Sequence, residues 1–141
     1  MSTPVHTRVA DALARLGALQ RYEENQQSRA AGLSPLQARA LVVLRRRSSV
    51  RLGELAKELL VTEGTLSAAV SALEEKELVV KRSDPAEHRA VQLELTRKGS
   101  TASRRAERWA GDQVEPALSD LNEDEASELL TSLLKLLRAF E

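Results

Sequence analysis

The sequence predicts a mainly α-helical fold with a small β-wing. Apolar residues recur at helical spacing over most of the 141 residues, as on the buried faces of helices. In the middle of the chain, two short amphipathic segments meet at a tight turn. A Val-rich segment and a segment of alternating apolar and polar residues follow, which is the pattern of a β-hairpin.

Composition limits the class of protein. With 42% apolar and 30% charged residues, and no apolar run near the roughly 20 residues that span a bilayer, we expect one compact domain and no membrane association. Arg8, Asp11 and Arg15 interrupt the N-terminal segment, so we expect no signal peptide and a cytoplasmic location. Cysteine is absent and the 2 histidines lie far apart, so neither a metal site nor a cofactor is expected.

The first half of the chain predicts three helices and a strand fragment. The first helix is expected from Val5 to about Ser28, followed by a break at Gly32. Ser34-Pro35-Leu36-Gln37 has the pattern of a capping box, which starts a second helix over 35–47. Residues 48–51 are long enough only for a strand fragment, and 52–60 predict a short third helix.

The second half predicts a fourth helix, the hairpin and two further helices. Thr62 is a good N-cap for a helix that runs to about Lys76. Strands are expected over 78–82 and 91–95, joined by the polar turn 83–89.

Two more N-caps follow the hairpin. Thr96 is expected to cap a helix that reaches roughly Val114 or a little past Pro116. Asn122 begins a second capping box before a last helix over 123–140.

A helix, a tight turn, a second helix and a two-stranded wing form the layout of a winged helix-turn-helix part, which reads double-stranded DNA. The second of these helices enters the major groove and the wing meets the adjacent backbone or minor groove. The expected DNA-binding residues of the helix are Thr62, Glu63, Gly64, Thr65, Ser67, Ala68 and Ser71. Those of the wing are Lys81, Arg82, His88 and Arg89.

The charge of this segment leaves two alternatives open. No Lys or Arg occurs from Thr62 to Glu75, so the side chains that most often read guanine are missing from this helix. The alternative is therefore a protein-interaction module that keeps the winged fold and has lost strong DNA binding. Arg45, Arg46 and Arg47 are interpreted as the basic end of a helix rather than as DNA contacts. No carboxylate pair, nucleophile with a base or Gly-rich phosphate loop indicates an enzyme.

The last helix predicts a homodimer. Its leucines cover too wide an arc for a single packing face, and isologous pairing with a second copy is the commonest way to cover the rest. The alternative is a helix buried deep in a monomer. The expected dimerisation residues are Val5, Val9, Leu13, Leu129, Leu130, Leu133, Leu137 and Phe140.

The sequence resembles the MarR (multiple antibiotic resistance regulator) family of transcription regulators. The resemblance rests on Leu33-Ser34-Pro35-Leu36-Gln37, Leu52-Gly53-Glu54-Leu55-Ala56, Thr65-Leu66-Ser67, Leu78-Val79, Asp84-Pro85 through Arg89, and Leu93-Glu94-Leu95-Thr96-Arg97-Lys98-Gly99. The flanking helices agree in number and order. The resemblance implies one MarR-like domain over 1–141, with dimerisation helices in 5–31 and 97–141 and the DNA-binding part in 34–96.

The resemblance also implies a function. Members of this family are usually homodimers that grip a pseudo-palindromic operator, and many release DNA when a small, often phenolic, ligand binds. We therefore expect a sequence-specific, ligand-responsive repressor. The chain departs from the common pattern at Glu87, at Leu60, where many relatives have glycine, and at Ala68 and Ala72, where many have basic or polar residues.

Overall fold

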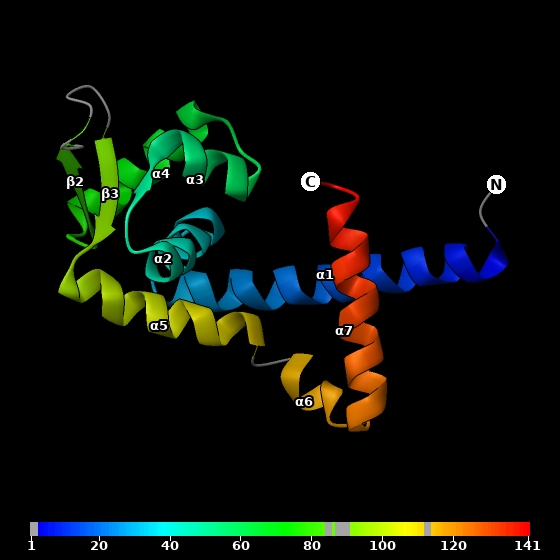
Figure 1. Cartoon of the computed structure of the whole chain (residues 1–141). Coiled ribbons are helices and arrows are strands. Elements are labelled where there is room, and N and C mark those ends of the chain that lie inside the picture. The colour runs from blue at the N-terminus through cyan, green and yellow to red at the C-terminus, as the bar shows by residue number, and fades with distance from the viewer. Residues whose placement is uncertain (1–2, 84–85, 87–90, 112–113) are drawn as a thin grey trace. The chain divides into compact units, whose positions relative to one another are not determined.

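The computed structural model describes residues 3–83, 86, 91–111 and 114–141 (Figure 1). The chain divides into two compact units, Met1–Ala110 and Gly111–Glu141. The first unit contains the N-terminal helix and the winged part, for which we use this name over residues 34–96. The second contains the C-terminal helices. Each unit is described by itself.

The order of elements agrees with the order that the sequence predicts, with one helix added. The helices are α1 (Pro4–Ala30), α2 (Pro35–Arg47), α3 (Leu52–Leu59), α4 (Glu63–Glu75), α5 (Arg97–Gly111), α6 (Val114–Leu118) and α7 (Glu123–Arg138). The strands are β1 (Val50–Arg51), β2 (Val79–Ser83) and β3 (Val91–Leu95). The expected class, mainly helical with a small β-wing, is confirmed.

The helices begin where the sequence places their caps. The Ser34 hydroxyl accepts a hydrogen bond from the N–H of Gln37, whose side chain accepts in return from the N–H of Ser34. Asn122 and Glu125 make the same reciprocal pair at the start of α7. These caps satisfy N–H groups that have no partner within the helix, and they fix the residue at which each helix begins.

One predicted helix is wrong in its extent. The helix after Thr96 was expected to reach Val114 or beyond Pro116, whereas α5 ends at Gly111 and a separate helix, α6, contains Pro116. Glycine weakens a helix, and the missing N–H of proline is tolerated only in the first turn, where Pro116 lies in α6.

The core of the first unit lies between the three-helix set α2, α3 and α4 and a small sheet. The sheet has the order β1-β3-β2 with antiparallel neighbours, so β3 is its central strand. Leu93 of β3 pairs in register with Val50 of β1 and is fully buried. Val79 of β2 is also fully buried, and the helices contribute the remaining fully buried large apolar side chains: Leu41, Leu44, Leu55, Leu66, Val70 and Leu73.

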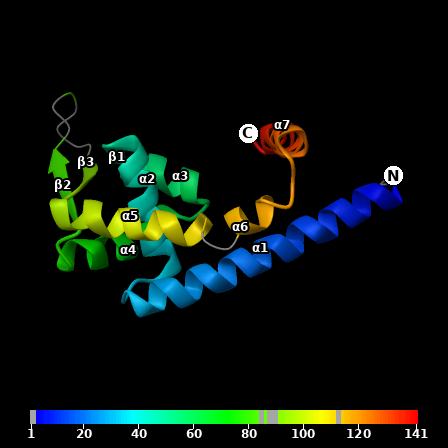
Figure 2. The same cartoon turned by 90° about the horizontal axis from the view of Figure 1, so that it is seen from below.

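Helix α1 is one uninterrupted helix of 27 residues, and Ser28 is its one buried residue among those described. Figures 1 and 2 both show its N-terminal half extending beyond the winged part. In the second unit, α7 carries no buried residue at all. Both helices therefore expose apolar side chains that their own unit leaves uncovered.

Candidate nucleic-acid interface

The recognition helix, our name for α4, is fixed by its buried side. Leu66, Val70 and Leu73 lie in the core against α2 and α3, which bury Leu41 and Leu55 on their side. This packing sets the rotation of the helix about its axis, because residues three and four apart share a face. The opposite face is therefore held toward the surface.

That opposite face carries the residues expected to contact DNA. Six of the seven are exposed: Thr62, Glu63, Gly64, Thr65, Ala68 and Ser71. Ser67 is half-buried. The face is small and polar, and the N–H groups of its first turn give the helix end a partial positive charge that favours phosphate.

A short chain of hydrogen bonds orients the hydroxyl at the tip of this helix. The N–H of Thr65 donates to the Thr62 hydroxyl over 3.2 Å, and the Thr62 hydroxyl donates to Thr65 Oγ1 over 2.9 Å. Since Thr65 Oγ1 already accepts, its own hydrogen is free to donate to an acceptor outside the protein. A base edge and a phosphate oxygen are both acceptors of this kind.

Gly53 in α3 and Gly64 in α4, on the two sides of the turn between these helices, differ in their surroundings. A Cβ on Gly53 of α3 would lie 2.7 Å from Oε1 of Glu63, so the carboxylate of Glu63 rests against α3. A Cβ on Gly64 would meet nothing within 4 Å. No intramolecular packing requires glycine at position 64, whereas close approach of another molecule would.

The turn between α3 and α4 begins with a residue in the left-handed conformation, Leu60. Leu60 has φ +58° and ψ +44°, in the left-handed region, and its side chain is 91% exposed. The N–H of Leu60 bonds to the carbonyls at the end of α3, which closes that helix. The turn therefore keeps a geometry suited to glycine while carrying leucine.

The wing cations that the structure describes are both paired with carboxylates. Lys81 Nζ lies 3.2 Å from Glu74 Oε1 of the recognition helix, and Arg82 pairs with Glu94 of β3. Lys81 pairs in register with the buried Leu93, and Arg82 pairs in register with Gln92. Since neighbouring residues of a strand point to opposite sides, the two cations lie on opposite faces of the hairpin. The other two expected wing residues, His88 and Arg89, lie outside the described residues, as does Glu87.

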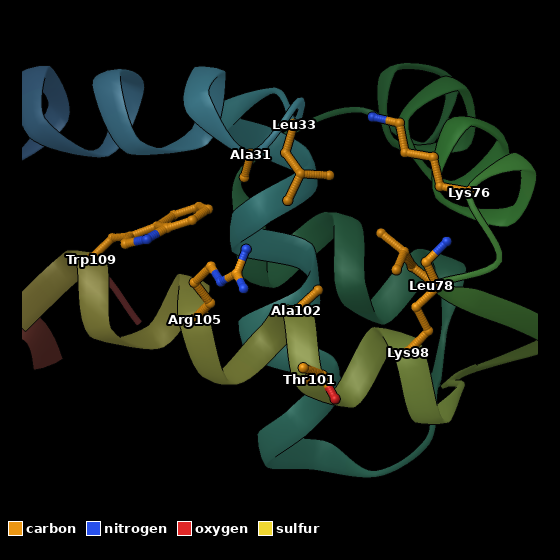
Figure 3. A pocket seen from close by; sticks show the side chains of 9 residues that line it. All are labelled: Ala31, Leu33, Lys76, Leu78, Lys98, Thr101, Ala102, Arg105 and Trp109. Atoms are coloured by element: carbon orange, nitrogen blue, oxygen red, sulfur yellow. The ribbon is translucent and has the colours of Figure 1, made fainter.

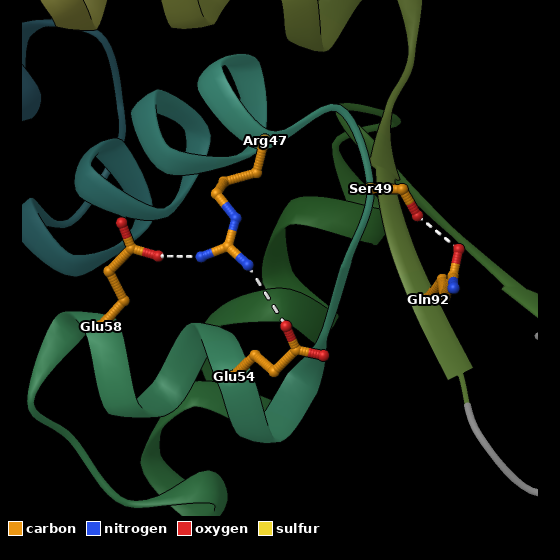
Figure 4. A network of polar contacts seen from close by, with 5 residues as sticks. All are labelled: Arg47, Ser49, Glu54, Glu58 and Gln92. Atoms are coloured by element: carbon orange, nitrogen blue, oxygen red, sulfur yellow. Dashed lines mark hydrogen bonds and ion pairs between the residues drawn. The ribbon is translucent and has the colours of Figure 1, made fainter.

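The arginines at the end of α2 form ion pairs with two neighbouring helices, α3 and α5. Arg47 donates to Glu58 over 2.8 Å and to Glu54 over 3.2 Å, both on α3 (Figure 4). Arg45 and Arg46 both pair with Glu107 of α5. Sequence reasoning interpreted these arginines as a helix end and missed their partners. The spacing of Glu54 and Glu58, one helical turn apart, was the available signal.

A glycine and a threonine join the wing to α5. Thr96 Oγ1 accepts from the N–H of Gly99 and donates to the carbonyl of Glu77. A Cβ on Gly99 would lie 1.8 Å from the carbonyl oxygen of Leu78. The Leu-Thr-x-x-Gly pattern of the sequence is therefore explained by a helix cap at Thr96 and a close backbone crossing at Gly99.

Among the residues that the structure describes, no three His, Cys, Asp or Glu side chains gather in a way that could hold a metal ion. Within the same residues, no helix is long and apolar enough to cross a membrane.

Comparison with known proteins agrees with the winged helix-turn-helix geometry. Residues 31–90 match the MarR family. The HTH-type transcriptional regulator MhqR of Bacillus subtilis is 26% identical over 104 residues, which are 74% of this chain and 71% of MhqR.

Solved structures extend the similarity to nearly the whole chain. A MarR-family regulator from Silicibacter pomeroyi aligns over 92% of this chain and 88% of its own, with a TM-score of 0.82 and 23% identity. Streptococcus pneumoniae FabT, solved in complex with DNA, aligns over 96% of this chain and 99% of its own, with a TM-score of 0.78 and 26% identity.

Proposed function

Since the chain belongs to the MarR family of winged helix-turn-helix transcriptional regulators, we propose that it binds a pseudo-palindromic operator as a homodimer and represses transcription from it. The family consists of DNA-binding regulators and not of enzymes. One observation carries the proposal for this chain. The recognition helix buries one face in the core and presents the other, small and polar, beside a β-wing.

The expected contacts divide into two kinds. Thr65 and its neighbours on α4 approach base edges, and the first turn of the helix approaches a phosphate. Lys81, Arg82, His88 and Arg89 provide the wing's attraction to the backbone or the minor groove. For Lys81 and Arg82 this attraction competes with the carboxylates of Glu74 and Glu94, so His88 and Arg89 are expected to matter most.

The first experiment selects bound sequences from random DNA and then measures affinity for the best operator and a scrambled duplex. Thr65→Val keeps the helix cap, because the Thr65 N–H makes that bond, and removes the outward hydroxyl. We expect it to weaken operator binding by about 1 kcal/mol, roughly fivefold, and scrambled binding much less. Thr101→Val is the control, since its hydroxyl bonds only within α5.

The second experiment measures affinity as a function of salt. Each phosphate neutralised contributes about −0.9 to the slope of log affinity against log salt, so Arg89→Ala should flatten the slope by about one unit per subunit. If Arg89 instead enters the minor groove, the substitution should cost about 1–3 kcal/mol per site and relax preference for flanking A·T pairs. Unchanged affinity and slope would favour the interaction-module alternative, which the cation-free recognition helix motivates.

A ligand response is the last part of the proposal. The family implies a small apolar or phenolic effector beside the second and fifth helices. A cleft of about 240 Å³ lies there, lined by Ala38, Val42 and Val43 of α2 and Ala106 of α5. Repression and its relief are tested together by in-vitro transcription from the selected operator, with compounds from a thermal-shift screen of phenolic acids and hydrophobic drugs. A screen without any ligand that changes DNA affinity would remove this part.

A further inference from the structure

The recognition helix lacks the side chains that most often read a purine in the major groove. From Thr62 to Glu75 it has no Arg, Lys, Asn or Gln. Arg and Lys read guanine through O6 and N7, and Asn and Gln read adenine through N6 and N7. A carboxylate can accept from the amino group of cytosine, but that of Glu63 rests against Gly53 of α3. Specific binding by this helix therefore has to use another feature of the base pairs.

Methyl groups occupy one flank of the helix instead. Thr65, Ala68 and Ala72 are spaced three and four residues apart, which places them within about 60° of one another around the helix axis. Thr65 and Ala68 are exposed, and Ala72 is half-buried. Apart from the Thr65 hydroxyl, these three side chains end only in methyl groups. The flank can therefore make apolar contacts at short range and one hydrogen bond.

Thr65 places a hydrogen-bond donor beside those methyl groups. Its Oγ1 accepts from the Thr62 hydroxyl over 2.9 Å, which leaves its own hydrogen to donate outward. The Cβ atoms of residues three apart on a helix, such as Thr65 and Ala68, lie about 5–6 Å from each other. Among the four bases, only thymine presents an acceptor, O4, next to a methyl group in the major groove. Guanine and adenine offer acceptors without a methyl group, and cytosine offers an amino donor.

We propose that the recognition helix reads thymine in each half of the operator. The Thr65 hydroxyl donates to O4, and the methyl group of Ala68 packs on the C5-methyl group of the base. Ala72 continues the apolar contact one turn further along the helix. The inference rests on the DNA binding proposed above and names the base that it selects. The preference comes from three side chains of this helix and not from the fold, which only places the helix.

Side chains this short reach a base only if the helix lies close to the groove and is held there. Gly64 lies one turn before Ala68, and a Cβ at this position would meet nothing within the chain, so the backbone can approach another molecule. At the other end, Lys76 is the C-cap residue of α4, and its Nζ donates to the carbonyl of Gly32 in the α1–α2 turn. Figure 3 shows this side chain reaching toward that turn. The helix is therefore anchored at its end as well as along its buried face.

The test uses deoxyuridine, which is thymidine without the C5-methyl group and keeps its hydrogen bonds. Each thymine of the selected operator is replaced by uracil in turn, and the affinity of the protein is measured. One buried methyl group is worth about fourfold, so we expect about this loss at one or two thymines of each half-site, and about tenfold or more when both half-sites are changed. The methyl group lies in the major groove, so minor-groove contacts of the wing do not contribute. An operator whose thymines can all be replaced without loss would overturn the proposal.

A variant assigns the methyl contact to the helix. In Ala68→Gly, the uracil penalty at the sensitive positions should fall from about fourfold to less than about twofold, because the partner methyl group is gone. The penalty is a ratio of two affinities of one variant, so a weaker helix cancels from it. Ser71→Gly is the matched control: Ser71 is exposed on the same helix, away from Thr65, and the variant should keep the fourfold ratio whatever its overall affinity. A full penalty in Ala68→Gly, or its loss in both variants, would overturn the assignment.

Guanine reading is tested in the same titrations. 7-Deazaguanine lacks the N7 acceptor, and we expect its replacement of each guanine in turn to lower affinity by less than about twofold. A loss that exceeds that of every uracil replacement and disappears in Thr65→Val would show that the hydroxyl reads guanine, and would overturn the proposal. A protein that selects no DNA sequence would contradict the proposed function as well. Selective operator binding that does not respond to uracil would overturn this inference alone.

Discussion

Leu60 shows how one residue can conflict with the conformation that its position requires. Its φ of +58° lies in the left-handed region, which costs an L-residue with a Cβ about 1 kcal/mol or more. The side chain is 91% exposed, so no packing in the single chain offsets this cost. The winged part therefore stores strain in the turn that leads into its recognition helix.

Replacing Leu60 should release that strain. Leu60→Gly is expected to raise the free energy of unfolding by about 1 kcal/mol, because glycine adopts this conformation without a steric penalty. Leu60→Ala removes the exposed side chain but keeps the Cβ and should change stability little. Urea unfolding of both variants measures the difference, and equal stabilisation by Ala and Gly would assign the effect to side-chain exposure instead.

At the scale of single residues, the sequence predicted the contacts between residues that lie close together along the chain. The caps at Ser34, Thr62 and Asn122 could be predicted because each uses a side chain and an N–H three residues apart. The ion pairs of Arg45 and Arg47 could not, since their partners belong to α5 and α3 and depend on how those helices pack. Whether the exposed residues of α4 contact DNA stays a prediction.

At the scale of elements, the junction between the wing and α5 depends on one missing side chain. The backbone of α5 at Gly99 crosses Leu78 so closely that any Cβ would meet its carbonyl oxygen. Thr96 fixes the same crossing by accepting from the Gly99 N–H and donating to the carbonyl of Glu77. The direction in which α5 leaves the sheet is therefore set by a backbone contact and a cap.

Two glycine substitutions should have opposite effects on stability. Gly99→Ala should lower the free energy of unfolding by about 1–3 kcal/mol, because the backbone of Leu78 has to move. Gly64→Ala, in open space within α4, should raise it by about 0.5–1 kcal/mol through better helix propensity. Thermal unfolding with calorimetry checks both signs.

Gly64→Ala carries a second expected result. If Gly64 is there for close approach to DNA, the stabilised variant should bind the selected operator more weakly than the wild type. Equal operator affinity would mean that the recognition helix does not approach DNA at this position.

Helix ends that depend on competing local signals were the least predictable feature of the elements. After Thr96, α5 ends at Gly111, and the separate helix α6 over Val114–Leu118 contains Pro116, with residues 112 and 113 outside the described part. Helices with a strong apolar period and a clear cap, such as α2, were predicted to the residue.

At the scale of the whole molecule, two apolar faces lack a partner within their own units. In α1, Val5, Val9 and Leu13 are exposed, and in α7 Leu129, Leu130, Leu137 and Phe140 are exposed while Leu133 is half-buried. Apolar side chains in such number on one face of a helix usually indicate an interface. The dimer predicted from the sequence remains the proposal for what covers them.

Light scattering should give the mass of two chains at micromolar concentration. The double substitution Leu130→Glu and Leu137→Glu should shift the protein to monomer and lower its unfolding temperature, because it buries charge in the interface. Leu60→Glu, at a leucine that is more exposed than either and lies outside both faces, is the control. A folded wild-type monomer with an unfolding temperature that does not change with protein concentration would contradict the dimer.

The pairing of the wing cations has a consequence for competition within a genome. Binding to arbitrary sequence depends almost entirely on phosphate contacts, and in this chain the recognition helix has no cation and Lys81 and Arg82 already have carboxylate partners. DNA of arbitrary sequence has to displace Glu74 and Glu94 from these two cations and gains no base contacts in return. On the function proposed above, we therefore expect binding to arbitrary DNA to be weak relative to binding to the operator, a ratio that titration of the operator and the scrambled duplex at one salt concentration measures.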